Sequence, residues 1–324
     1  MPDRSFLYLS RADVEQVAPG MEEIIALLET AFREKGNGRV EMPPKPGIHP
    51  RPDSFIHAMP AYIPALRSAG IKWVSGFPEN PRRGLPYVSG LIILNDDETG
   101  LPLCVMDCTW ITGHRTGAAT ALAARHLARA DSEVVGMLAC GVQGRTNLKA
   151  LATLFPIRRV YAYDVVPAAA RRFADEMSEK IGVGILVVNE PRAAVVESDI
   201  VVTSGPILKE PRPVIEAGWL RPGVFGSAVD FDSYWQPEAL AAMDHISTDD
   251  LTQFRYYRSV GYFQRTPDPK SDLGELVAGL KPGRTHREER TLAMNLGLAL
   301  SDMAVAPAVH ARAVAKGIGT RLPL

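Results

Sequence analysis

The sequence predicts an α/β protein made of a doubly wound, Rossmann-type domain and a second, α+β domain. The first observation is residues 134–164, where an apolar run, a glycine-containing turn, a helical pattern and another short apolar run follow one another. The second is that apolar runs and helical patterns keep alternating up to about residue 250. The third is that residues 55–107 hold four short apolar runs separated by Pro and Gly, which favours an antiparallel sheet.

The composition excludes several classes of protein. A chain of 324 residues is long enough for two domains, and 46% hydrophobic with 23% charged residues is typical of a soluble globular protein. The formal net charge of -1 gives no reason to expect a nucleic acid or an acidic membrane surface as partner. No apolar run is long enough to span a membrane, and the N-terminus lacks the pattern of a secretory signal. We therefore expect a cytoplasmic protein without a membrane partner.

The three cysteines, Cys104, Cys108 and Cys140, do not have the spacing of a common zinc site. Their odd number means that they cannot all form disulfides within one chain. We expect three reduced thiols and no metal.

The N-terminal third begins with an apolar strand at residues 6–9. Ser10 and Asp13 can cap a helix that is expected to run to about Lys35. Five prolines make residues 40–53 an extended loop. The expected strands that follow are residues 55–62, 70–77, 88–95 and 101–107, and an alanine-rich helix is expected over 111–129.

The remaining elements alternate as a doubly wound domain requires. Helices are expected over residues 167–181 and 192–197, and strands over 134–139, 160–163, 184–189, 200–203, 224–229 and, as the last, 245–248. The tail from Thr291 to Lys316 is expected to be nearly continuous helix with a break at Pro307.

The turn after the first strand of this domain has the residue types that a dinucleotide needs. The fingerprint is Ala139-x-Gly141-x-x-Gly144, with alanine where the first glycine usually stands. Backbone N–H groups and the following helix N-terminus can hold a pyrophosphate, and Asp164, about 20 residues on, can accept hydrogen bonds from the ribose hydroxyls. Because this carboxylate would repel the extra phosphate of NADP, we expect NAD. The alternative is an ordinary αβ turn that needs glycine for packing.

Four charged residues stand beside apolar strands or helices. Lys72 lies in an apolar strand, Arg115 at the start of the alanine-rich helix, and Asp230 and Asp232 follow a buried strand directly. The carboxyl ends of strands form the ligand crevice of a doubly wound domain, so the two acids are candidates for its chemistry. The alternatives are an edge-strand lysine, a surface charge at a helix end, and turn or N-cap acids.

At these residues the chain resembles the ornithine cyclodeaminase/μ-crystallin family over nearly its whole length. The motif Arg-Thr-x-Ala-Ala followed later in the chain by Gly-Val-Gln is more specific to this family than the nucleotide fingerprint alone. The matching segments are residues 59–62, 70–72, 95–107, 112–119, 141–145, 198–203 and 317–320.

The resemblance implies roles for individual residues. Arg115 looks like the arginine that binds the substrate carboxylate, and Lys72 like the lysine beside that carboxylate or the reacting nitrogen. An ungapped reading from Gly223 puts Asp232 at the family's proton-transferring aspartate, with Asp230 as the alternative. Further substrate contacts are expected at Lys45 and Met59. Cofactor contacts are expected at Gly141, Val142, Gln143, Gly144, Asp164, Thr203, Ser204 and Val229.

The chain departs from the family pattern at two places in the expected pocket. The family's aspartate is usually followed by a Pro-Gly-Lys-type turn, but residues 233–236 read Ser-Tyr-Trp-Gln. Lys45 stands nearest to a position that is often arginine. Ornithine should therefore not be assumed to be the substrate.

The function expected from the resemblance is NAD-dependent hydride transfer between nicotinamide and the α-carbon of an amino acid or imine. One alternative is redox-neutral cyclodeamination with tightly bound NAD, and another is a non-catalytic binding protein like μ-crystallin. We expect residues 1–118 and 305–324 to form the substrate-binding and dimerisation domain and residues 119–304 the dinucleotide-binding domain. Exposed edges of the N-terminal sheet favour a homodimer formed through this domain.

Overall fold

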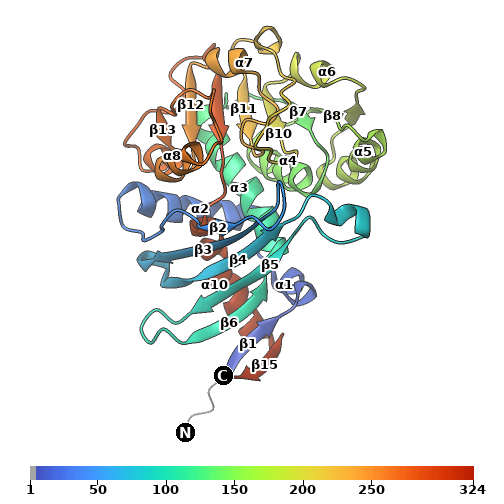
Figure 1. The fold of residues 1–324 in the computed structure, drawn as a ribbon. Helices are drawn as coiled ribbons and strands as arrows, with labels where there is room; N and C mark the ends of the chain where they lie inside the picture. Colours follow the sequence, from blue (N-terminus) through green and yellow to red (C-terminus); the bar gives the residue numbers. More distant parts are fainter. Residues whose placement is uncertain (1–4) are drawn as a thin grey trace. The chain divides into compact units, whose positions relative to one another are not determined.

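The structure is a computed structural model that describes residues 5–324. Its chain divides into two compact units. Unit 1 contains the residues through Arg115 together with Leu298–Leu324, and unit 2 contains Thr116–Gly297. Each unit is built on one β-sheet (Figure 1). That the units correspond to the predicted substrate and cofactor domains stays a prediction.

Unit 1 has a seven-stranded sheet in the order β15-β1-β6-β5-β4-β3-β2. Neighbouring strands are antiparallel except for β1 and β6, which are parallel. The predicted antiparallel arrangement of the four strands between residues 55 and 107 is confirmed. The strands are β1 Ser5–Leu9, β2 Gly47–Ile48, β3 Phe55–Ile63, β4 Ser68–Gly76, β5 Val88–Asn95, β6 Pro102–Asp107 and β15 Thr320–Pro323.

The helix predicted from residue 10 to residue 35 is two helices. Ser10 and Asp13 form a reciprocal capping box at the start of α1, in which Asp13 Oδ2 accepts from the backbone N–H of Ser10 at 2.9 Å. The chain then leaves the helical conformation at residues 18–20, where Pro19 and the N-cap Gly20 separate the two helices. The helices of this unit are α1 Arg11–Val17, α2 Met21–Gly36, the first residues of α3 Thr109–Leu127, and α10 Ala299–Lys316, with short 3-10 turns η1 Pro64–Leu66 and η2 Asn80–Arg83.

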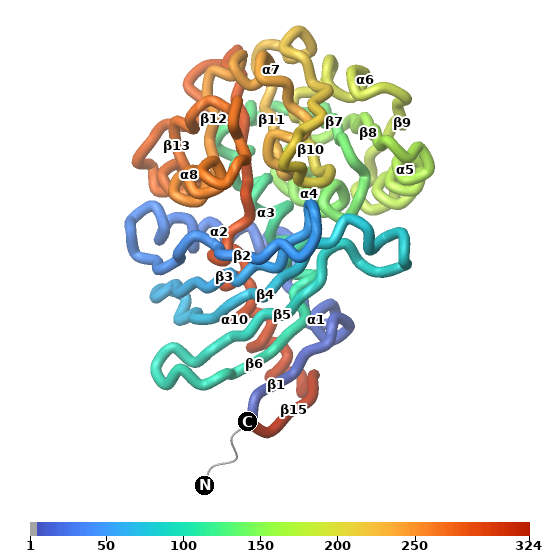
Figure 2. Tube along the Cα trace, viewed as in Figure 1, coloured from blue at the N-terminus to red at the C-terminus, as the bar shows by residue number. Residues whose placement is uncertain are grey.

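Helix α10 packs on the face of the sheet formed by β3, β4 and β5 (Figures 1 and 2). Gly70 permits the close approach, because a Cβ there would lie 2.9 Å from Met303 Sδ and 2.2 Å from the backbone oxygen of Ile93. Pro307 lies inside α10 without ending it, so the predicted break is wrong. Proline removes the helical donor to the carbonyl four residues earlier, and here Ser68 Oγ donates to that carbonyl, Met303 O, at 2.7 Å.

Unit 2 has an eight-stranded sheet in the order β13-β12-β14-β11-β10-β7-β8-β9, and every neighbouring pair is parallel. The predicted doubly wound class is confirmed. The strands are β7 Val134–Leu138, β8 Arg159–Tyr163, β9 Ile185–Val187, β10 Ile200–Thr203, β11 Phe225–Ala228, β12 His245–Thr248, β13 Ser271–Asp272 and β14 Thr291–Met294. The helices are the rest of α3, α4 Val142–Leu154, α5 Pro167–Ile181, α6 Pro191–Val195, α7 Pro237–Ala241, α8 Leu251–Ser259 and α9 Leu273–Val277, with η3 Ala217–Trp219.

The tail expected to be helical from residue 291 begins instead as a central strand. Residues 291–294 form β14, which lies between β11 and β12, and the helix starts only at Ala299. The reason is physical, because a fully buried parallel strand is apolar on both faces and lacks the alternation that separates a strand from a helix.

Among residues 5–324, no helix combines the length and the apolar character needed to cross a membrane.

Candidate functional site

The nucleotide turn of unit 2 joins β7 to α4. Ala139, which replaces the fingerprint's first glycine, has a positive φ of 75°, so it adopts the left-handed conformation that the turn requires. Gly144 lies against this turn, and a Cβ there would be 2.7 Å from Ala139 O. Gly141 is the N-cap of α4, and a Cβ built on it would meet no atom within 4 Å. The turn therefore has an open, side-chain-free approach to a helix N-terminus, and its residues fit a pyrophosphate.

Asp164 holds the nucleotide turn through the backbone. Its Oδ2 accepts a hydrogen bond from Cys140 N at 2.8 Å, and its Oδ1 accepts one from Val166 N at 2.8 Å. Each carboxylate oxygen can accept a second bond, so these contacts leave room for ribose hydroxyls. The carboxylate is thus fixed at the end of β8, where the fingerprint expects it.

The other predicted cofactor residues of unit 2 lie at the carboxyl ends of β10 and β11. Ser204 Oγ donates to Ala139 O at 3.0 Å, which ties the end of β10 to the nucleotide turn. Val229 N donates to Thr203 O at 2.9 Å and continues the pairing of β10 with β11. Val142 and Gln143 form the first turn of α4, and Val142 is exposed.

Unit 1 contains a buried charge centre formed by Lys72, Arg115 and Asp302. Lys72 is on β4, and strand alternation turns it to the inner face while its neighbour Trp73 is exposed. Lys72 Nζ lies 2.7 Å from Asp302 Oδ2, and Arg115 Nε donates to Asp302 Oδ1 at 3.1 Å. The exposed fractions of Lys72, Arg115 and Asp302 are 0%, 6% and 0%. The structure thus brings together two predicted residues and one that sequence reasoning missed.

Two cations share one carboxylate in this charge centre. Burial lowers the pKa of Lys72, the Arg115 cation lowers it further, and the Asp302 carboxylate acts in the opposite direction. Lys72 also donates to Thr112 Oγ1 at 3.4 Å. Buried charges are stable only where they are paired, so a formal excess of one positive charge favours an anionic ligand.

The two other substrate residues predicted for unit 1 are also buried. Met59 on β3 is 3% exposed and pairs in register with Lys72, and Lys45 is 8% exposed. His57, two residues before Met59 on the same face, has its pKa lowered to about 3, first by burial and then by Lys45, His49 and Lys72. The positive field that these lysines produce therefore reaches the inner face of β3.

In unit 2, Asp230 is fully buried beyond the end of β11. Its Oδ1 accepts from Thr203 Oγ1 at 2.7 Å and its Oδ2 from Gly205 N at 3.0 Å. Trp235 Nε1 in turn donates to Thr203 Oγ1 at 3.1 Å. Burial raises the pKa of Asp230 to about 7, because the hydroxyl and the amide only partly compensate for the loss of water.

Asp232 has a freer carboxylate. Its Oδ2 accepts from Thr266 Oγ1 at 3.0 Å, and its buried Oδ1 has no hydrogen-bond partner among the described residues. Burial raises its pKa. Asp232 lines a small cavity of about 80 Å³ within unit 2, together with Lys209, Arg265 and others. An unsatisfied, buried carboxylate oxygen of raised pKa has the properties of a proton-transfer group.

In an extended run, Asp230 and Asp232 would face the same side of the strand. The chain is not extended here. Phe231 between them has a positive φ of 63°, and Ser233 N donates to Asp230 O at 3.3 Å. The chain therefore turns directly after β11, and the two acids have different surroundings. Neither acid's role could be read from spacing alone.

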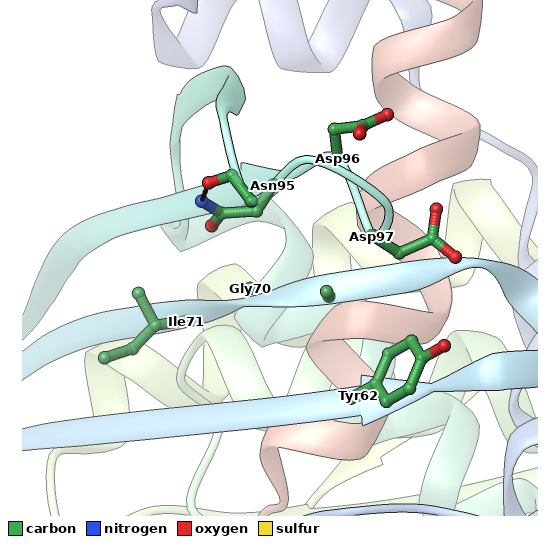
Figure 3. Close-up of a pocket in the computed structure, with 8 residues that line it drawn as sticks. Tyr62, Gly70, Ile71, Asn95, Asp96 and Asp97 are labelled. Atoms are coloured by element: carbon green, nitrogen blue, oxygen red, sulfur yellow. Dashed lines mark hydrogen bonds between the residues drawn. The ribbon is translucent and has the colours of Figure 1, made fainter.

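A larger hollow of about 460 Å³ lies on the outer side of the unit 1 sheet (Figure 3). Tyr62, Ile71, Asp96 and Asp97 are among its lining residues. Ile71 precedes Lys72 on β4 and so faces away from the charge centre. The charged lining residues are acids, so this hollow is unsuited to a carboxylate ligand.

Asp302 had one signal in the sequence that could have revealed it. It is the single acid in residues 298–309, a segment of apolar and small residues, and residues 299–306 of α10 are all buried. A lone carboxylate on a buried helix requires a cation, and Lys72 in an apolar strand is the matching anomaly.

Comparison with known proteins identifies related chains. The sequence model of the ornithine cyclodeaminase/mu-crystallin family matches residues 6–317. An alanine dehydrogenase of Archaeoglobus fulgidus is 36% identical over 324 residues, which cover 98% of each chain. The solved structure of Thermococcus litoralis Δ1-pyrroline-2-carboxylate reductase with NADH and L-proline is 34% identical, with a TM-score of 0.88 and coverage of 98% of this chain and 100% of that one. An archaeal alanine dehydrogenase dimer with bound NAD is 36% identical, with a TM-score of 0.88 and coverage of 99% of each chain. The chain belongs to the ornithine cyclodeaminase/mu-crystallin family.

Proposed function

We propose that the protein is an NAD-dependent oxidoreductase that acts on the C–N bond of an amino acid or imino acid. The observation that carries the proposal is the buried charge centre, in which Lys72 and Arg115 share a single carboxylate, Asp302. A substrate carboxylate would balance the remaining positive charge. The nucleotide turn and the family membership supply the second half of the proposal, because NAD accepts or donates the hydride when it is bound.

The residues of unit 1 bind and orient the substrate in this proposal. Arg115 and Lys72 hold the α-carboxylate, and a guanidinium can form a two-pronged pair with it. Lys45 and Met59, buried on the same unit, complete the binding surface. Fixing the carboxylate fixes the α-carbon, the atom from which or to which the hydride moves.

Asp232 is the proton-transfer group in this proposal. Loss of a hydride from the α-carbon requires a free nitrogen lone pair, so a base must first take the ammonium proton, and the same group returns it in the reductive direction. The buried Oδ1 of Asp232 has no hydrogen-bond partner within residues 5–324, whereas both oxygens of Asp230 are hydrogen-bonded. We therefore assign the proton to Asp232 and give Asp230 a supporting role at the loop that follows β10.

The function is tested by absorbance at the reduced-nicotinamide band with a panel of amino acids, of keto acids plus amines, and of cyclic imines. We expect a net signal with NAD or NADH and a weaker one with the phosphorylated cofactors, because Asp164 would face the extra phosphate. Absence of a signal across the panel, in protein that binds NAD, would contradict the proposal.

Asp232→Asn should retain NAD affinity and lose about 10²–10⁴-fold in turnover, the usual range for general acid–base catalysis. Asp230→Asn is the matched control, since it removes the neighbouring buried carboxylate, and it should lose much less. If Asp230→Asn were the inactive variant and Asp232→Asn the active one, the base would be misassigned.

Redox-neutral cyclodeamination is the second candidate, because it uses the same hydride chemistry and the family description includes ornithine cyclodeaminase. Ammonia release from a diamino acid without net reduction of nicotinamide would identify it. Tight binding of ligand with neither signal would instead identify a non-catalytic binding protein like μ-crystallin.

We also propose that the protein is a homodimer formed through unit 1. The outer face of its sheet exposes large apolar side chains, with Trp73 48% and Leu91 41% exposed at paired positions of β4 and β5. Large apolar side chains exposed side by side on a sheet favour an interaction surface. Light scattering at micromolar protein should give twice the chain mass, and Trp73→Glu should lower it. A monomeric mass for the wild type would contradict the proposal.

A cytoplasmic location is proposed from the thiols. Cys104, Cys108 and Cys140 are free and buried, and a reducing compartment keeps such thiols intact. Fractionation of the native cells would test it.

A further inference from the structure

Asp302 occupies the middle of the charge centre of unit 1. Its Oδ1 accepts from Arg115 Nε at 3.1 Å and its Oδ2 lies 2.7 Å from Lys72 Nζ, so each of its oxygens is opposite a different cation. Asp302 is 0% exposed and comes from α10, while the two cations come from α3 and β4. One carboxylate therefore links three elements that are far apart in the sequence.

The contact with Arg115 uses Nε, so Asp302 does not engage the guanidinium through its terminal amino groups. Those groups and the one proton of the Lys72 ammonium that faces neither Asp302 nor Thr112 are the donors suited to a second carboxylate. Asp302 therefore fixes the orientation of both cations and leaves the terminal amino groups of Arg115 for a ligand. In this arrangement it acts as a positioning residue.

The charge of the centre follows from simple counting. Lys72 and Arg115 carry two positive charges and Asp302 one negative charge, which leaves a formal excess of one. Without Asp302 the excess would be two. In a site shielded from water, a difference of one unit charge changes which ligand charge is favoured.

We propose that Asp302 determines the substrate class by setting this excess to one, so that the Lys72–Arg115 pair accepts a single carboxylate and discriminates against a second negative charge held close to the first. This inference rests on the proposed function of the site and adds a specificity-determining residue to it. Such specificity depends on rejecting a ligand with two close negative charges as much as on binding a ligand with one.

Anion binding tests the proposal without requiring turnover. Propionate carries one carboxylate and malonate two that are close together, and the dissociation constant of each is measured by calorimetric titration. Compared with wild type, Asp302→Asn should shift the ratio of the two constants toward malonate by about tenfold or more, because one unit of charge is lost in a desolvated site. Asp302→Glu keeps the charge and should restore a ratio close to that of wild type.

Asp199→Asn is the matched control. Asp199 is a buried carboxylate of unit 2 that pairs with Arg129 and with Arg221, the latter at 2.7 Å. Its loss should lower the melting temperature and leave the propionate-to-malonate ratio unchanged. An equal weakening of both anions in Asp302→Asn that Asp302→Glu does not reverse would show a merely structural role and overturn the proposal.

If Asp302→Asn does not fold, the double variant Lys72→Met/Asp302→Asn replaces it. This variant again has an excess of one positive charge, from Arg115, so its ratio should match the wild type, and a shift toward malonate would overturn the proposal. Wild-type protein that binds neither anion would overturn it as well. Failure of the hydride-transfer panel alone contradicts the proposed function and not the assignment of Asp302, because the anion titrations do not depend on catalysis.

Discussion

Asp302 in unit 1 and Asp230 in unit 2 are both fully buried carboxylates, yet their surroundings differ in kind. Asp302 faces two cations, Lys72 and Arg115. Asp230 faces a hydroxyl and a backbone amide, from Thr203 and Gly205. Burial raises the pKa of Asp230 to about 7, because its two neutral donors only partly compensate for the loss of water. Burial alone therefore does not determine what an acid can do; its partners do.

The largest expected effect comes from removing Asp302, the acid whose partners are cations. Asp302→Ala leaves two buried cations without their anion and should lower the free energy of unfolding by about 3–5 kcal/mol. Asp230→Ala is the control of equal burial and should lower it by about 1–3 kcal/mol, the range for buried donors that lose an acceptor. Urea denaturation measures both. Equal losses would mean that the two environments are energetically the same.

The second effect is a pH dependence of stability that comes from Asp230. Because its pKa is about 7 in the folded protein and near 3.8 when unfolded, the folded state binds the proton more tightly. Its contribution to stability is therefore complete below about pH 4 and is lost as the pH rises to 7, by about 1.4 kcal/mol per pH unit. Asp230→Asn should lack this slope, so the difference in unfolding free energy between variant and wild type, measured by urea denaturation at several pH values, should change with pH. A parallel pH profile for the two proteins would contradict the raised pKa.

The smallest expected effect comes from a hydrogen bond between neutral groups in unit 1. Its loss of unfolding free energy can be compared with the losses expected for Asp302 and Asp230. Ser68→Ala removes the donor to Met303 O and should destabilise the protein by about 1 kcal/mol. In a Pro307→Ala background the restored helical N–H can bond the same carbonyl, so Ser68→Ala should be less harmful there. A double-mutant cycle by thermal or urea denaturation measures the coupling, and strict additivity would show that the serine does not compensate for the proline.

The sequence predicted most of the fold where periodicity was clear. The strands of the first sheet and the helix at residues 167–181 agree closely with β3–β6 and α5. It failed at residues 291–294, because a strand buried on both faces has no period, and at Pro307, because the compensating Ser68 lies more than 230 residues away.

The candidate site was predictable only in part for a similar reason. Lys72 and Arg115 stood out as charges in apolar surroundings, and they do lie in one buried centre. Asp302 is a lone acid in a buried helical segment, but its two partners lie about 190 and 230 residues earlier in the chain, so the sequence pattern did not connect the three. The positive φ of Phe231 separates the surroundings of Asp230 and Asp232, and a bulky aromatic residue gives no sign of that conformation in advance.

The division of unit 1 between the two ends of the chain has a consequence for synthesis on the ribosome. Lys72 and Arg115 are made early, and Asp302, the carboxylate that pairs with both, is made much later, in α10. Until Leu298–Leu324 have been made, the sheet of unit 1 lacks the helix that packs on β3–β5. Lys72 and Arg115 then also lack the carboxylate of Asp302, with which they pair when buried. Unit 2 is contiguous in sequence and is complete before that moment. The nascent chain can therefore complete unit 2 before the last helix of unit 1 has been made.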